Sequence, residues 1–176
     1  MLEQFYPRLY VRSAYGIPYR ELYEKGIRGV IFDVDNTLVP HDAPADKRAV
    51  KLFEEFRAMG METCLLSNNR EPRVAAFAGA VGTKYIYKAG KPSVKGYAKA
   101  MEVMGTNRDT TIFVGDQLFT DVWGANRAGI VSFLTEPIDP KEEIQIVLKR
   151  YPEKLILWFY RRSLRGRRQK AGRKES

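Results

Sequence analysis

The chain has 176 residues, of which 44% are apolar, and a formal net charge of +9 at pH 7. This length suits one domain with a sizeable core, and the apolar content excludes a wholly disordered chain. A single cysteine and a single histidine exclude a disulfide framework and any site built from several residues of either kind. No apolar run approaches about 18 residues and no secretory signal is present, so we expect a cytoplasmic protein.

Short apolar runs alternate along the chain with segments of helical periodicity. After an N-terminal extension of 27 residues, the expected elements in chain order are a strand at 29–32, a helix at 46–59, a strand at 63–66, a helix at 72–79, a strand at 85–87, a helix at 93–104, a strand at 111–114, a helix at 121–128, a strand at 131–134 and a helix at 141–150. This alternation predicts an α/β domain whose parallel sheet carries helices on both faces.

The positive charge is concentrated at the C-terminal end. Residues 161–176 contain eight Lys or Arg and one acidic residue, so they carry +7, whereas the other 160 residues carry +2. We expect residues 1–160 to form the domain and residues 161–176 to be a basic, disordered tail. The tail either keeps the protein soluble or binds an anionic partner, which would be lipid headgroups or RNA.

The segment before the tail, residues 153–160, is apolar and contains Trp158 and Tyr160 between basic residues. Such a segment is typical of an anchor at a membrane surface. It is equally typical of a helix that packs on the domain. Both interpretations stay open from the sequence.

Polar side chains follow four of the predicted strands. They are Asp33, Asp35 and Thr37 after the first, Ser67 and Asn68 after the second, Lys91 after the third, and Gly115 and Asp116, with Asp121, after the fourth. In parallel sheets, ligands bind beyond the carboxyl ends of the strands, so we expect these residues to share one crevice. Several carboxylates in one crevice repel one another, and Mg²⁺ would relieve that repulsion.

This set of side chains suits phosphoryl transfer. A carboxylate can attack phosphorus and form an aspartyl-phosphate. A second carboxyl two residues further on can protonate the leaving oxygen and then activate the hydrolytic water. A serine hydroxyl and a lysine can hold the phosphoryl oxygens where charge develops.

The four groups, in this order, resemble the motifs of the haloacid dehalogenase superfamily. The resemblance implies a role for each residue: Asp33 as nucleophile and metal ligand, Asp35 as general acid and base with its backbone carbonyl on the metal, Thr37 and Gly115 in support, Ser67 and Asn68 as phosphate ligands, Lys91 as the neutralising cation, Asp116 as a metal ligand, and Asp121 as an indirect or water-mediated ligand. The dehalogenases lack an acid at the position of Asp35, so the match favours a phosphatase. The implied cofactor is Mg²⁺.

Residues 7–11 and 26–39 resemble the YqeG-type, subfamily IIIA members, which are similar to mitochondrial and plastid phosphatidylglycerophosphate phosphatases. The resemblance implies hydrolysis of phosphatidylglycerophosphate in phosphatidylglycerol synthesis. The apolar segment and the basic tail, which lies outside the resemblance, would hold the enzyme at the inner face of the membrane. One alternative is a soluble phosphatase of sugar phosphates or nucleotides. The other is an RNA- or ribosome-associated binding protein that uses the basic tail.

The expected site is open. Thr37 and Ser67 are 30 positions apart, and Ser67 and Lys91 are 24 apart, so neither interval holds a cap domain of about 50 residues or more. An open site either takes its lid from a neighbouring subunit or accepts a substrate too large to enclose, such as a phosphate displayed on a membrane surface. His41, on the loop above the crevice, is expected to be a solvated histidine.

Overall fold

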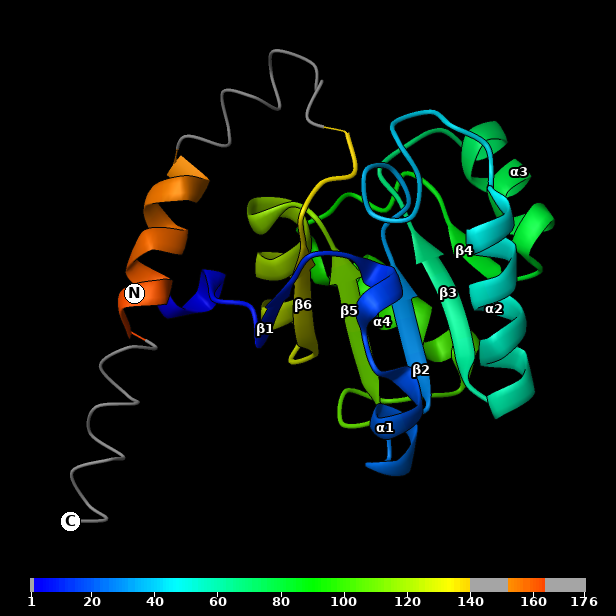
Figure 1. Cartoon of the computed structure of the whole chain (residues 1–176), viewed down its shortest axis with the longest axis horizontal. Helices are drawn as coiled ribbons and strands as arrows, with labels where there is room; N and C mark the ends of the chain where they lie inside the picture. The colour runs from blue at the N-terminus through cyan, green and yellow to red at the C-terminus, as the bar shows by residue number, and fades with distance from the viewer. Residues whose placement is uncertain (1, 140–151, 164–176) are drawn as a thin grey trace.

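The computed structural model of the chain describes residues 2–139 and 152–163 and contains a six-stranded sheet in the order β1-β6-β5-β2-β3-β4 (Figure 1). The strands are β1 (Leu9–Val11), β2 (Gly29–Phe32), β3 (Glu62–Leu66), β4 (Lys84–Ile86), β5 (Thr111–Gly115) and β6 (Val131–Thr135). Every neighbouring pair is parallel. The carboxyl ends of β2, β3 and β5 therefore meet at one edge of the sheet, as expected for the predicted α/β fold.

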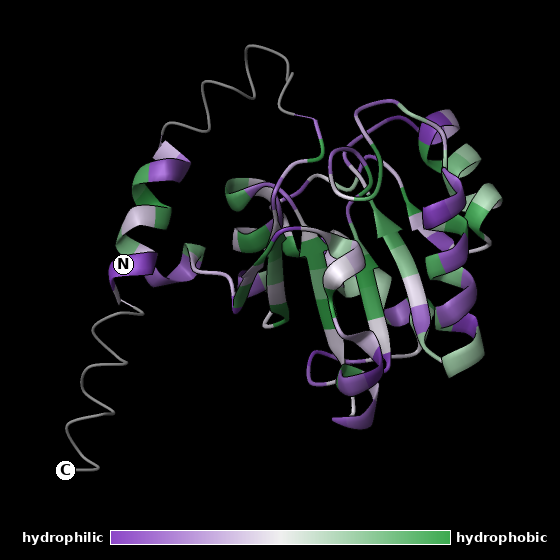
Figure 2. Ribbon diagram, viewed as in Figure 1, coloured by the Kyte–Doolittle hydropathy of each residue, from purple (hydrophilic) through white to green (hydrophobic). Residues whose placement is uncertain are grey.

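Helices cover both faces of this sheet. They are α1 (Tyr19–Glu24), α2 (Lys47–Met59), α3 (Glu71–Val81), α4 (Val94–Met104) and α5 (Trp123–Arg127), with short 3₁₀ turns at Leu2–Phe5 and Ala14–Gly16 and a π-helical turn at Leu118–Val122. Residues 152–163 form a further helix. In Figure 2 the strands are largely apolar, while the outer side of α2 is hydrophilic.

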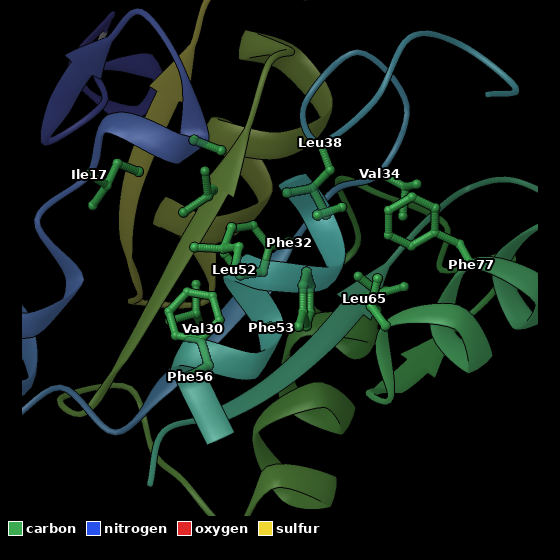
Figure 3. Close-up of a cluster of buried hydrophobic side chains, with 14 of the residues drawn as sticks. Ile17, Val30, Phe32, Val34, Leu38, Leu52, Phe53, Phe56, Leu65 and Phe77 are labelled. Atoms are coloured by element: carbon green, nitrogen blue, oxygen red, sulfur yellow. The ribbon is translucent and has the colours of Figure 1, made fainter. Parts of the chain in front are cut away.

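Alternating residues of β2, β3 and β5 enter two separate cores. Val30 and Phe32 of β2 pack with α1, α2 and α3, and this cluster is shown in Figure 3. Ile31, between them, packs on the opposite face with Tyr97 of α4 and Ala125 of α5. This alternation follows from the period of two in a strand, and it buries the whole of β2. The first catalytic candidates therefore follow a rigid, fully buried strand.

Several helix ends have local causes. The side chain of Asp46 accepts a hydrogen bond from the backbone N–H of Ala49 and so begins α2, while Gly60 ends it at a φ of 75°. Ser93 likewise caps α4, and Gly105 ends it. These boundaries agree with the predicted helices at 46–59 and 93–104.

Three parts of the chain differ from expectation. The N-terminal extension contributes the edge strand β1 and helix α1, which are too short for periodicity to reveal. The predicted helix at 121–128 begins earlier, as the π turn, because the carboxylate of Asp121 accepts the N–H of Gln117. β4 lies one residue before the predicted position. The predicted helix at 141–150 lies outside the described residues.

The residues between Thr37 and Lys91 are all described, and within them no cap domain is inserted. The first interval holds a loop, α2 and β3, and the second holds α3 and β4. The absence of a cap there confirms that part of the fold prediction. Among residues 2–139 and 152–163, no helix is long and apolar enough to cross a membrane.

Candidate active site

A cavity of about 370 Å³ lies beyond the carboxyl ends of β2 and β3. Its walls include Asp33, Asp35, Ser67, Asn68 and Lys91. The structure therefore brings together side chains that are up to 58 positions apart in the sequence. Their arrangement is set by the strands that precede them.

Lys91 is buried between two carboxylates. Its Nζ lies 2.6 Å from Asp33 Oδ1 and 2.7 Å from Asp121 Oδ1, and all three side chains are almost fully enclosed. Burial, only partly offset by Lys91, raises the pKa of Asp33 well above its usual range. Burial alone would lower the pKa of Lys91, but the carboxylates of Asp121 and Asp33 raise it. The ammonium is therefore charged at neutral pH.

Asp116 completes a buried acidic cluster with Asp33 and Asp121. One carboxylate oxygen from each residue lies within 4.8 Å of the others. The Thr37 hydroxyl donates to Asp116 Oδ1 at 3.4 Å. The three carboxylates offer hard oxygen donors close to one point, and such a group fits a small divalent cation.

Asp35 has partners that the sequence did not indicate. Its carboxylate accepts hydrogen bonds from Arg73 at 2.9 Å, from Asn69 at 3.2 Å and from the backbone N–H of Asp42 at 3.0 Å. Although burial opposes them, these contacts hold the pKa of Asp35 below its usual range. Arg73 lies on α3 and has no motif of its own, so only the packing of α3 beside this loop reveals its role.

The loop after β3 shapes the phosphate side of the cavity. The Ser67 hydroxyl accepts a hydrogen bond from the backbone N–H of Asn69 at 3.1 Å, which leaves its own proton free to turn toward the cavity. The Asn68 side chain bonds the backbone of Lys91 on both sides, through Lys91 N at 2.8 Å and Lys91 O at 3.3 Å. Asn68 therefore orients Lys91 and lines the cavity at the same time.

His41 also lines the cavity. Its ring lies 3.4 Å from Asp42, and its side chain is 41% exposed, as expected for a solvated histidine. With Asp35 and Asp42 it forms a second, more exposed group of possible metal ligands. This group lacks the burial of the cluster around Asp116.

Tyr97 of α4 supports the loop that carries Asp116 and Asp121. Its buried hydroxyl lies 2.9 Å from Thr120 O and 3.1 Å from Asp121 O, so its proton is shared between the two carbonyls. Gly115 allows the same loop to close, because a Cβ there would lie 2.4 Å from Asp121 Oδ2. Sequence reasoning missed Tyr97, since a tyrosine inside an amphipathic helix reads as core.

Gly115→Ala is expected to destabilise the fold by about 1–3 kcal/mol, since the added methyl overlaps Asp121 in a packed site. Activity should fall as well because Asp121 must move. The matched control is Gly79→Ala on the exposed side of α3, where a Cβ meets nothing within 4 Å. That change should stabilise the helix by roughly 0.5–1 kcal/mol. Urea unfolding of both variants measures the difference, and equal stability would contradict the close approach.

Comparison with known proteins gives the family. The pattern of the haloacid dehalogenase-like hydrolases matches residues 40–129, which include Ser67, Lys91 and Asp116. The chain is 36% identical over 159 residues to "Probable phosphatase YqeG" of Bacillus subtilis, covering 89% of this chain and 92% of that protein. It therefore belongs to the haloacid dehalogenase-like hydrolases, and within them it is an enzyme of the phosphatase class.

Two further proteins are similar to the chain. The chain is 30% identical over 171 residues to "Phosphatidylglycerophosphate phosphatase 1, chloroplastic/mitochondrial" of Arabidopsis thaliana, covering 90% of this chain and 48% of that protein. Among solved structures, an uncharacterized protein from Corynebacterium glutamicum matches with a TM-score of 0.53 and 24% identity over 70% of this chain and 95% of that one. The second similarity confirms the fold alone.

Proposed function

We propose that the chain is a Mg²⁺-dependent phosphomonoester hydrolase in which Asp33 is the nucleophile. The observation that carries this proposal is the position of Asp33. Its carboxylate lines an open cavity, lies 2.6 Å from the Lys91 ammonium and belongs to the buried cluster with Asp116. A phosphoryl group in this cavity would meet a nucleophile and a fixed positive charge together.

The reaction would run in two displacements. Asp33 attacks phosphorus, the bond to the leaving alcohol oxygen breaks, and Asp35 gives that oxygen a proton. Asp35 then takes a proton from a water molecule, which attacks the aspartyl-phosphate and releases inorganic phosphate and Asp33. Lys91 and the Ser67 hydroxyl hold the phosphoryl oxygens throughout. Mg²⁺, held by Asp33, Asp116 and the Asp35 carbonyl, would supply charge neutralisation and orientation.

The surroundings of Asp35 suit the second displacement directly. Its bonds from Arg73 and Asn69 favour the ionised form, which a base requires. For the first displacement the carboxyl must take up a proton. The entering phosphate brings negative charge close to Asp35, which raises its pKa and favours that uptake.

We propose phosphatidylglycerophosphate as the substrate, in the synthesis of phosphatidylglycerol. The name of the Arabidopsis relative supports this substrate, although the chain spans about half the length of that protein. The open cavity supports it too, since a phosphate on a lipid surface needs access rather than enclosure.

The C-terminal helix, residues 152–163, supports a location at the membrane surface. Its inner side buries Ile156 and Tyr160, and its outer side exposes Leu155, Trp158 and Phe159 by 59%, 52% and 39%. The Arg162 guanidinium lies 5.5 Å from the Trp158 ring. Exposed aromatic residues beside basic ones suit the interface of an anionic membrane. The buried side of the helix agrees with packing on the domain, and its exposed side supports the proposed membrane contact.

The helix also bears on the proposed domain boundary. It continues to residue 163, and Arg161 lies over the Tyr10 ring at 5.6 Å. We therefore place the start of the tail after residue 163 when designing truncations. Residues 164–176, which include six Lys or Arg, lie outside the described residues.

The substitution pair Trp158→Glu and Phe159→Glu is expected to weaken binding to phosphatidylglycerol-containing vesicles by about tenfold or more, since it removes apolar contact and adds repulsion. Deleting residues 164–176 should weaken vesicle binding further, but only at low salt. The expected loss of binding free energy is about 1 kcal/mol for each deleted basic residue that lies near the membrane surface. Val103→Glu, a similar change on exposed α4, should have no effect. Co-sedimentation at two salt concentrations gives these values. Unchanged vesicle binding by the doubly substituted protein would contradict the membrane contact and favour a soluble phosphatase. A gel shift of RNA that is lost when residues 164–176 are deleted would favour the RNA-binding alternative.

The proposed function is tested by phosphate release from a panel of substrates with Mg²⁺. We expect a higher kcat/KM for phosphatidylglycerophosphate in mixed vesicles than for sugar phosphates or nucleotides. A higher kcat/KM for a soluble phosphate would overturn the lipid substrate while keeping the phosphatase. No release from any phosphomonoester would overturn the phosphatase mechanism as drawn.

A further inference from the structure

A buried carboxylate on the C-terminal helix bonds the loop that follows β5. Glu153 is only 6% exposed, and its Oε1 accepts a hydrogen bond from the backbone N–H of Leu118 at 3.0 Å. Leu118 lies two residues after Asp116 and three before Asp121. A contact across 35 positions therefore ends within the segment that carries two members of the acidic cluster.

The N–H of Leu118 needs an acceptor because it begins a helical segment. The first N–H groups of a helix have no partner within it. Gln117, at the capping position, makes no side-chain capping bond. Instead the Asp121 carboxylate takes the N–H of Gln117 at 3.0 Å, and Glu153 takes the next one. Two carboxylates thus fix consecutive backbone groups at the positive end of this segment.

Apolar packing holds Glu153 in place. Ile156, one turn further along the C-terminal helix, packs in a buried cluster with Leu118 and Val122. The Tyr160 ring lies 5.2 Å from the Tyr6 ring, which fixes the next turn on the N-terminal segment. The helix and the loop between Asp116 and Asp121 therefore form one packed unit.

We propose that Glu153 is a positioning residue for the metal and phosphate site. Acting through Leu118, it fixes the backbone that presents Asp116 and Asp121. This inference rests on the proposed function, because it assigns the acidic cluster to a metal. Partners of this kind, one shell removed from a metal, typically change metal affinity or activity by roughly 10- to 100-fold when they are removed.

The test compares three full-length variants by two readouts: the rise in Tm on adding Mg²⁺, and the Mg²⁺ concentration that half-saturates hydrolysis of p-nitrophenyl phosphate. Glu153→Ala should require roughly 10- to 100-fold more Mg²⁺ in both. Glu153→Gln keeps an acceptor for the Leu118 N–H and should restore most of the affinity. Tyr160→Leu, also on the buried side of the helix, should lower the Tm without Mg²⁺ while leaving the Mg²⁺ requirement unchanged.

A Mg²⁺ requirement equal to wild type in Glu153→Ala would overturn the inference, and so would an equal increase in Tyr160→Leu. If Glu153→Gln does not restore the Mg²⁺ affinity, Glu153 does not act through its hydrogen bond to the Leu118 N–H, and the inference is overturned. If Glu153→Ala does not fold, Glu153→Asp takes its place, because the shorter side chain withdraws the carboxylate from the Leu118 N–H. Its Mg²⁺ requirement is then compared with wild type in the same way. If the wild type cleaves no phosphomonoester, the proposed function fails, while the Tm rise still decides the role of Glu153.

Discussion

Replacing Asp33 by Asn is expected to reduce phosphate release by about 10³-fold or more while leaving the fold intact. The amide keeps the size of the side chain but cannot attack phosphorus, so no aspartyl-phosphate forms. The rest of the cavity, including the Lys91 ammonium beside Asp121, is preserved in this variant. Substrate binding should therefore survive, and the loss should appear in kcat.

Stability provides the control for this substitution. Burial raises the pKa of Asp33 to about 7, so the stability of the fold falls as the pH rises from about 4, the pKa in the unfolded chain, to about 7, and the full loss persists above that pH. Removing the charge is therefore expected to leave the Tm in chelator unchanged or higher. Asp109→Asn, the same change at an exposed turn, should keep wild-type activity. Near wild-type phosphate release by purified Asp33→Asn protein would refute Asp33 as the nucleophile.

Local sequence signals were sufficient for most of the sheet. The runs at β2, β3, β5 and β6 are apolar, so their type could be predicted, and the polar residues after β2, β3, β4 and β5 marked the expected crevice. β1 could not, because it has three residues at a sheet edge and its pairing with β6 is made by the tertiary fold. The π turn was missed for a similar reason, since it depends on a hydrogen bond from Gln117 to the Asp121 side chain.

The candidate site likewise contains residues that the local sequence predicts and residues that only the tertiary fold brings into place. Residues at strand ends could be predicted, because parallel strands bring their carboxyl ends together. Arg73, Tyr97 and Glu153 could not, because each reaches the site from a helix whose position depends on packing. Their sequence neighbourhoods are ordinary amphipathic helices. What distinguishes them is a polar atom buried against a loop, which only the folded structure shows.

Two of these supporting residues bond different backbone groups of the loop between Asp116 and Asp121. Tyr97 bonds the carbonyls of Thr120 and Asp121, and Glu153 bonds the N–H of Leu118. Asp116 and Asp121 on this loop lie close to Asp33, so the carboxylates repel one another and the loop needs such restraint. The restraint and the closeness of the three carboxylates together favour a preformed cation site, and this leads to the second prediction.

Excess chelator is expected to abolish phosphate release, and Mg²⁺ should restore it. The buried cluster gathers three carboxylates, and a divalent cation held by them would neutralise charge where the phosphoryl group enters. Ca²⁺ should restore activity poorly, because its larger and looser coordination shell suits in-line transfer less well than the octahedral shell of Mg²⁺. Full activity in excess chelator would contradict the site.

Two substitutions locate the cation. Asp116→Asn should raise the Mg²⁺ requirement by more than about 100-fold, beyond the range typical of supporting residues, since it removes a proposed direct ligand. Asp42→Asn alters the exposed group with Asp35 and His41 and should change that requirement far less. Calorimetric titration of Mg²⁺ into each variant gives the comparison. A larger effect at Asp42 than at Asp116 would place the cation in the exposed group, where Arg73 already neutralises Asp35.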